Sequence, residues 1–185
     1  MRIGYADPPY PGCAYRYRDH PDYAGEVDHA QLIDRLEREF DGWVLHTHSP
    51  AIPLIAPLLP DGVRWGAWVK SFANFGHNVH PAFAWEPVIF KQCRRILDSK
   101  KRAMTCVMRD WVSASMTLRR TVIGAKPEAV CHWAFEIVGA EPDDELVDLF
   151  PGSGAVTRAW EAWRPQLEMA LREERTSAQD GGMAE

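Results

Sequence analysis

The segment Arg-Ile-Gly-Tyr-Ala-Asp-Pro-Pro-Tyr, residues 2–10, joins an apolar run to a polar ending rich in proline. The run Arg2–Ala6 predicts a short buried strand, and the two prolines end it. The motif Asp7-Pro8-Pro9-Tyr10 therefore follows the carboxyl end of a strand. Since ligands of open α/β sheets bind beyond the carboxyl ends of strands, this motif is a candidate functional site.

The chemistry of this motif suits an amino group. Two prolines restrict the backbone and remove two N–H donors, which leaves a patch of hydrogen-bond acceptors. The Asp7 carboxylate and the Pro8 carbonyl can both accept hydrogen bonds from an NH₂ group, and the ring of Tyr10 offers a base a surface for stacking. A purely structural turn can contain the same residues, so the motif alone leaves both interpretations open.

A second motif, Asp148-Leu149-Phe150-Pro151-Gly152-Ser153-Gly154, occupies a predicted strand-to-helix turn. Gly152 and Gly154 permit unusual backbone angles and close approach of a ligand. Such a turn beside a helix N-terminus can hold a nucleoside cofactor. Glycines are common at this place in α/β folds, so this motif is also weak evidence by itself.

Apolar periodicity along the rest of the chain predicts strands that alternate with helices, which indicates one α/β domain with a mainly parallel sheet. The domain is expected over residues 1–175, with a disordered polar tail over 176–185. The expected strands are 43–47, 64–69, 87–91, 145–150 and a short final strand at 167–171, and the expected helices are 28–40, a proline-distorted helix at 49–59, 127–138 and 155–163.

The composition is that of an ordinary globular protein, with 185 residues and a net charge of −5. No window approaches the ~18 continuous apolar residues of a membrane helix, and the N-terminus has no signal-peptide core. The four cysteines contain no CxxC pair, so we interpret them as reduced thiols and expect a cytoplasmic protein without a membrane partner.

Positive charge is concentrated in residues 91–126, which contain ten Lys or Arg and two acids, a local net charge of +8. Such a stretch can contact phosphates, although a solvated surface loop has the same composition. Polar residues that follow the third strand are also expected to face a substrate. The candidate nucleic-acid contacts are Arg94, Arg95, Lys100, Lys101, Arg102, Asn74 and His77, with Asn78 and His80 nearby.

A metal site could be formed by four histidines, His46, His48, His77 and His80. Histidines in such positions are more often polar core or surface residues, so we expect no metal. No cysteine has neighbouring residues that would activate it as a nucleophile.

Together, the two motifs resemble the signature motifs of amino-group methyltransferases, which use S-adenosylmethionine to methylate adenine N6 or cytosine N4. The resemblance covers roughly residues 2–163. The catalytic motif comes first and the cofactor turn comes late, which is the permuted order of the β-type bacterial DNA methyltransferases and of the messenger-RNA adenosine methyltransferase family. In both groups a Lys-Pro helix precedes the cofactor strand, and Lys126-Pro127 matches that element.

The resemblance implies a Rossmann-like class I methyltransferase fold, with a mainly parallel sheet and helices on both faces. The fold would be circularly permuted and reduced at the C-terminus, because few residues follow Trp163; Glu173 is the candidate ribose ligand. The motif Asp7, Pro8, Pro9 and Tyr10 would hold the target base, and the cofactor site would comprise Ala6, Asp7, Lys126, Asp148, Phe150, Gly152, Ser153 and Gly154.

The resemblance favours a methyltransferase acting on adenine N6 in DNA, with S-adenosylmethionine as cofactor and nucleic acid as partner. RNA adenosine N6 and DNA cytosine N4 are the alternative targets. A catalytically inactive nucleic-acid-binding subunit is the alternative outside enzymes, and such subunits usually lose one of the two motifs. The short recognition segment, about 94–120, indicates that a homodimer or a partner subunit helps to grip the substrate.

Overall fold

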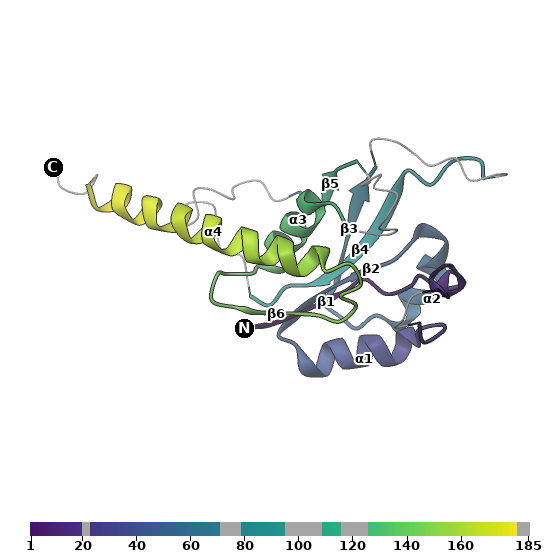
Figure 1. Cartoon of the computed structure of the whole chain (residues 1–185). Helices are drawn as coiled ribbons and strands as arrows, with labels where there is room; N and C mark the ends of the chain where they lie inside the picture. Colours follow the sequence, from purple (N-terminus) through teal and green to yellow (C-terminus); the bar gives the residue numbers. More distant parts are fainter. Residues whose placement is uncertain (20–22, 71–78, 95–108, 116–125, 181–185) are drawn as a thin grey trace.

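The computed structural model describes residues 1–19, 23–70, 79–94, 109–115 and 126–180. Within these residues the chain forms a six-stranded sheet with the order β5-β3-β4-β2-β1-β6 (Figure 1). The strands are β1 (Arg2–Ala6), β2 (Gly42–His46), β3 (Arg64–Val69), β4 (Trp85–Lys91), β5 (Trp111–Ser113) and β6 (Glu145–Asp148). The helices are α1 (His29–Glu39), α2 (Ile52–Ile55), α3 (Glu128–Val138) and α4 (Ala155–Asp180), with 3₁₀ turns η1 (Ala14–Tyr17), η2 (Ser49–Ala51) and η3 (Ala56–Leu58).

The sheet is mixed, with one strand reversed. β1 pairs in parallel with both β2 and β6, and β3 pairs in parallel with β5. β4 lies between β2 and β3 and is antiparallel to both. All described strands except β4 run in the same direction, which confirms the expectation of a mainly parallel sheet. The apolar periodicity gave no sign that β4 is reversed.

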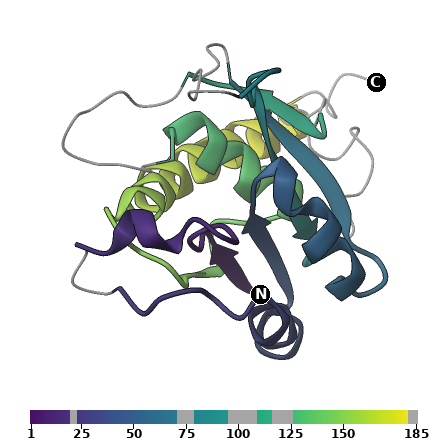
Figure 2. The ribbon, with the colours of Figure 1, turned by 90° about the vertical axis from the view of Figure 1, so that its right-hand side faces the viewer.

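Helices cover both faces of the sheet, as the sequence predicted (Figures 1 and 2). On one face, α1 buries its apolar stripe with Leu32, Ile33 and Leu36 against β1 and β2. On the other face, α3 and α4 form a core in which Phe135 packs against Trp160 and Trp163. Each face of β1 therefore has its own apolar layer, which explains why this strand is buried from Ile3 onward.

Local sequence signals explain several helix boundaries. The Asp28 side chain accepts a hydrogen bond from the Gln31 N–H at 3.0 Å and so caps the N-terminus of α1. At the end of α3, Gly139 has a φ of 82°, a left-handed conformation that favours glycine. Between β2 and β3, the prolines break the expected helix into η2, α2 and η3.

The C-terminal part differs from the sequence prediction. α4 continues through 167–171, so the predicted final strand was wrong. The alternation of Leu167, Met169 and Leu171 suggested a strand, but residues 166–175 consist of strong helix formers, which extend the preceding helix. Residues 176–180, expected in a disordered tail, belong to this helix as well, while 181–185 lie outside the described residues. In the described part of the chain, no helix is both long and apolar enough to cross a membrane.

The short strand β5 was not predicted. Buried tryptophans on the α3 face fix both of its ends. Trp68 Nε1 donates to the Ala114 carbonyl at 2.9 Å, and Trp133 Nε1 donates to the Arg109 carbonyl at 2.8 Å. These donors come from residues distant in sequence, so no local pattern could indicate this strand.

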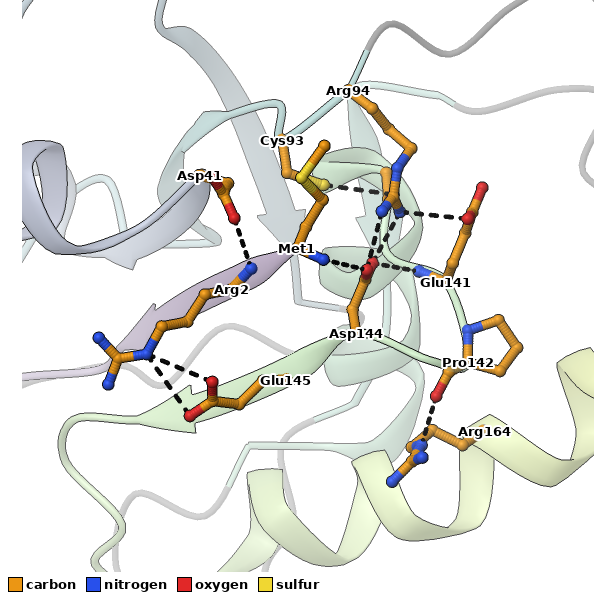
Figure 3. Close-up of polar contacts among 11 residues, drawn as sticks. Met1, Arg2, Asp41, Cys93, Arg94, Glu141, Pro142, Asp144, Glu145 and Arg164 are labelled. Carbon is orange, nitrogen blue, oxygen red and sulfur yellow. Dashed lines mark hydrogen bonds and ion pairs between the residues drawn. The ribbon is translucent and has the colours of Figure 1, made fainter.

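A polar cluster ties β6 to the end of β4 at the amino-terminal edge of the parallel strands (Figure 3). The Asp144 carboxylate accepts two hydrogen bonds from Arg94, at 2.6 and 2.8 Å, and one from the Glu141 backbone N–H at 2.7 Å. The Met1 amino group is 2.8 Å from the same carboxylate. Asp144 precedes β6, so Arg94 lies at the edge opposite Asp148, where β6 ends. The structure thus places Arg94 in an ion pair with Asp144, and its assignment as a phosphate contact stays a prediction.

Replacement of Asp144 by Ala should lower the free energy of unfolding by roughly 2–4 kcal/mol, because it leaves the Arg94 guanidinium without its buried carboxylate partner. Urea denaturation at pH 7 measures this change. The control is Glu145→Ala, which removes an exposed contact to Arg2 and should change stability by less than about 0.5 kcal/mol. Equal effects of the two variants would contradict the role assigned to the Asp144 cluster.

Candidate functional site

The candidate site lies where the chain leaves two neighbouring parallel strands in opposite directions. β1 leads toward α1 on one face, and β6 leads into α4 on the other. In open α/β sheets this arrangement creates a crevice at the carboxyl ends of the two strands, and ligands bind there. The Leu149 N–H donates to the Tyr5 carbonyl at 2.9 Å and keeps the strands paired up to this edge. Both motifs therefore meet at one crevice.

At the end of β1, the Asp7 carboxylate forms an ion pair with Lys126. Lys126 Nζ lies 2.7 Å from Asp7 Oδ1 and 3.0 Å from the Tyr10 hydroxyl. Only 6% of the Lys126 side chain and 17% of the Asp7 side chain are exposed. The structure thus brings together three predicted site residues that are up to 119 positions apart in sequence.

Glu86 on β4 completes this polar cluster. The Tyr10 hydroxyl donates to Glu86 Oε2 at 2.6 Å, and Lys70 Nζ lies 2.5 Å from Oε1. Lys126 Nζ is 3.8 Å from Oε2. Two carboxylates and two ammonium groups therefore balance one another, which is how a protein tolerates charges in a largely buried site.

The balance of burial and charge differs among these groups. Burial raises the pKa of Asp7, although Lys126 opposes the rise. Burial by itself would lower the pKa of Lys126, but the Asp7 and Glu86 carboxylates outweigh it and raise that pKa. For Glu86, burial acts to raise the pKa, and Lys126 and Lys70 outweigh it and lower the pKa. Lys126 and Glu86 therefore stay ionised. Of the two carboxyl groups in this cluster, Asp7 is the one that is more easily protonated.

The glycine turn after β6 has the backbone that its sequence suggested. Gly152 and Gly154 have φ angles of 43° and 70°, and the Gly154 N–H donates to the Pro151 carbonyl at 2.6 Å. The Ser153 carbonyl accepts a hydrogen bond from Arg158 Nη1 at 2.9 Å, which ties the turn to α4. The turn therefore lies at the N-terminus of α4, with the Arg158 side chain packed against Gly154.

Asp148 has one oxygen without a protein partner. Its Oδ1 accepts a hydrogen bond from the Phe150 N–H at 3.2 Å, whereas the buried Oδ2 has no partner among the described residues. Burial raises the pKa of this carboxyl to about 6, and the negative charge of Asp7 adds to the rise. A buried acceptor that lacks a donor is costly, so Oδ2 is suited to receive a donor from a ligand in the crevice.

Several predicted contacts fall outside the described residues, so their assignment stays a prediction: Asn74, His77, Asn78, Arg95, Lys100, Lys101 and Arg102. The side chain of Glu173 is also not described.

Sequence reasoning missed Glu86, Lys70 and His48 as parts of the site. The ring of His48 lies 5.4 Å from the ring of Tyr10, measured between centroids. In the sequence, Glu86 is a single carboxylate near the start of an apolar strand, and Lys70 directly follows another strand. Neither position indicates by itself that the residue belongs to the site. Their proximity depends on the pairing of Trp68 with Glu86 across β3 and β4.

His46 belongs to the core. Its Nε2 is 2.7 Å from the Tyr5 hydroxyl, and burial lowers its pKa well below the usual value. Within the part of the chain that the structure describes, no group of His, Cys, Asp or Glu side chains could hold a metal ion.

Comparison with known proteins gives similarity at the level of structure. No family model and no curated protein matches the sequence. The crystal structure of the M1.HpyAVI–SAM complex superposes with a TM-score of 0.55 at 17% identity, over 89% of this chain and 78% of that one. PvuII DNA methyltransferase (cytosine-N4-specific) superposes with a TM-score of 0.57 at 12% identity, over 88% and 71% of the two chains. The chain has the Rossmann-like fold of these enzymes.

Replacement of Asp148 by Asn should stabilise the protein at high pH. Because the pKa of Asp148 is raised, ionisation of this carboxyl lowers stability as the pH rises through about 6. The variant should therefore gain roughly 2–4 °C in Tm at pH 8, and the gain should vanish near pH 4. Thermal scans at both values measure the difference. The exposed control Asp143→Asn should show no such pH-dependent gain; a similar gain in the control would refute the assignment to Asp148.

Proposed function

We propose that this protein is an S-adenosylmethionine-dependent methyltransferase that acts on the exocyclic amino group of adenine in DNA. The observation that carries the proposal is the hydrogen bond of 2.7 Å from the Lys126 ammonium to Asp7 Oδ1. A nitrogen with N–H donors thus fits against the carboxylate that the motif provides for a base amino group. The glycine turn lies on the adjacent strand, so a methyl donor and an acceptor base would meet in one crevice.

The residues beside β6 fit the cofactor. S-adenosylmethionine carries hydrogen-bond donors, and Asp148 Oδ2, which has no partner among the described residues, would accept one. The absence of side chains at Gly152 and Gly154 would permit close approach of an adenosine group, and Phe150 adds an apolar surface beside the turn. The holding residues would be Ala6, Asp7, Lys126, Asp148, Phe150, Gly152, Ser153 and Gly154. When bound, the cofactor supplies an electrophilic methyl group on a sulfonium sulfur.

The acceptor side of the reaction rests on Asp7, Pro8 and Tyr10. A base amino group is a weak nucleophile because its lone pair is delocalised into the ring. Asp7 and the Pro8 carbonyl would accept its two N–H bonds and stabilise the positive charge that develops on nitrogen. Positioning of the nitrogen in line with the methyl group supplies much of the rate. In duplex DNA the base would flip out and stack on Tyr10.

Lys126 Nζ lies against Oδ1 of Asp7, so an incoming base amino group would share this carboxylate with the ammonium or displace it. Glu86 Oε2 lies 3.8 Å from Lys126 Nζ and offers a second carboxylate for the displaced ammonium. The movement would free Asp7 Oδ1 without leaving the ammonium unpaired, which avoids the large cost of a lone buried charge.

The order of the strands supports the permuted layout. The strand that carries Asp7 comes first in the sequence yet lies inside the sheet, and the strand that carries Asp148 comes last and lies at the sheet edge. Among the described residues, β6 is the edge strand next to β1. A cytoplasmic location fits the free thiols of Cys13, Cys93 and Cys131.

Cytosine N4 in DNA is the second candidate target. The cytosine-N4 specificity of the PvuII enzyme, which superposes on this chain, favours this target. RNA adenosine N6 is the third candidate. An inactive nucleic-acid-binding subunit is disfavoured because Asp7 and the glycine turn are both intact. A homodimer or a partner subunit remains part of the proposal because the recognition segment is short.

Replacement of Asp7 by Ala should reduce transfer of labelled methyl groups to DNA by at least about 100-fold, since it removes an acceptor that acts in the transition state. Nucleoside analysis of the product identifies the methylated base. Binding of S-adenosylmethionine, measured by calorimetry, should weaken by a much smaller factor than methyl transfer, because Asp148 and the glycine turn remain in this variant. Asp34→Ala, which alters an exposed ion pair on α1, serves as control. Full transfer by Asp7→Ala would end the proposal.

Replacement of Glu86 by Ala should lower kcat about 10-fold with little change in KM for DNA, because the Tyr10 hydroxyl and Lys126 both lose a partner. Glu86→Gln should restore part of the rate, since the amide can still accept the hydrogen bond from Tyr10. The measurement is steady-state methyl transfer at several DNA concentrations. An equal loss in both variants, confined to KM, would contradict this positioning role.

A further inference from the structure

Three tryptophans lie on one face of the sheet near its β5 edge and are open to solvent. Trp65, Trp85 and Trp111 are 37%, 40% and 43% exposed. Across the sheet, Ala67 pairs with Trp111, and Val69 pairs with Trp85. Paired residues point to the same side, as do alternate residues of one strand, so all three indoles share a face. We call Trp65, Trp85 and Trp111 the indole face.

The core on the opposite side of the sheet holds the indole face in place. Trp68 and Val112 point to that side and pack with α3 and α4. The indole N–H groups of Trp68 and Trp133 fix the carbonyls that flank β5. On the indole-face side, α1 and α2 share a core with β1, β2 and Ile89 of β4. The three exposed rings are therefore presented on a rigid support.

We propose that the indole face binds an unpaired stretch of DNA next to the target base. Every base has a flat aromatic surface, so stacking on exposed indoles is strong and tolerant of sequence. Rigid rings lose little entropy on binding. The choice of DNA as the polymer rests on the proposed function, whereas the stacking surface itself does not.

The charge around β5 favours nucleic acid as the occupant. In the sequence, this strand lies within residues 91–126, where seven Lys or Arg and two acids remain after Lys91, Arg94 and Lys126, which pair with carboxylates elsewhere, are left out. The Arg109 guanidinium carbon lies 5.2 Å from the centroid of the Trp111 ring. If a base stacks on Trp111, the Arg109 guanidinium would be placed to contact a phosphate beside that base. The basic segment is therefore anchored to the sheet at the strand that carries one of the three rings.

The indole face leads to the candidate site. Trp85 is the first residue of β4, at the edge of the sheet where β1 and β3 end. The next residue, Glu86, pairs with Trp68 and so points to the opposite side of the sheet, where it accepts the hydrogen bond from the Tyr10 hydroxyl at this same edge. A strand of DNA whose flipped base reaches Asp7 would thus pass over this end of β4, with neighbouring bases near the indoles.

A second copy of the chain fits this surface less well. The three indoles expose roughly 300 Å² together, whereas a stable dimer buries about 800 Å² per partner. Ala67 and Ser113 between the rings add little apolar area. The surface is large enough for two or three stacked bases and too small for a stable protein interface.

The test is fluorescence anisotropy of the full-length protein with a labelled single-stranded DNA of mixed sequence, without S-adenosylmethionine. Trp111→Leu and Trp65→Leu should each weaken binding by about fivefold or more, and Trp111→Phe, which keeps an aromatic ring, should stay within about twofold. Met169→Ala, which alters an exposed apolar residue on α4, should bind like the wild type. Arg109→Ala, whose side chain is exposed, should reduce the salt dependence of binding by one phosphate contact.

Normal binding by both leucine variants would overturn the proposal, as would a loss confined to RNA or to fully paired duplex. Conversion of a dimer to a monomer by Trp111→Leu, seen by sedimentation with DNA binding intact, would assign the surface to a second copy instead. Tryptophan-dependent binding without any methyl transfer would leave this surface standing and remove the proposed reaction. Methyl transfer by the tryptophan variants with unchanged DNA binding and unchanged KM would remove the indole-face proposal and leave the proposed reaction standing.

Discussion

The buried ion pair between Asp7 and Lys126 is the constraint on which the site depends. It joins the end of β1 to the residue before α3, across 119 positions of sequence. Neither charge is stable in such a place alone, because a buried ion without a partner costs several kcal/mol. Glu86 and Lys70 extend the pair from β4 and β3, so the cluster holds three parts of the sheet and one helix in fixed register.

The same cluster gives the protein a resting state that resembles a bound one. The Lys126 ammonium presents N–H donors to Asp7, as a base amino group would in the proposed reaction. In the proposed reaction, a base amino group would share Asp7 with this internal cation or displace it toward Glu86. On the neighbouring strand, Asp148 keeps an acceptor without a partner. Asp7 therefore has a charged partner within the protein, whereas Asp148 Oδ2 has none among the described residues and is suited to a donor from a ligand.

Sequence patterns predicted local features well because their causes are local. Asp28 caps a helix through a neighbouring N–H, and Gly139 ends one through its own backbone angle. The direction of β4, the existence of β5 and the continuation of α4 were not predicted. Strand direction depends on pairing with distant strands, and β5 depends on indole donors from two other elements. In α4, the period-two pattern of 167–171 competed with helix propensity, and propensity prevailed.

By itself, the sequence determined that a polar motif and a glycine turn each follow a strand, since apolar runs and their proline or glycine endings are local properties. It also determined the acceptor chemistry of Asp7 and Pro8. Only the tertiary structure decided that Lys126 and Glu86 meet Asp7 and Tyr10, because strand order and burial set those distances. It likewise decided which tryptophans pack inside and which stay exposed, since strand register selects the face.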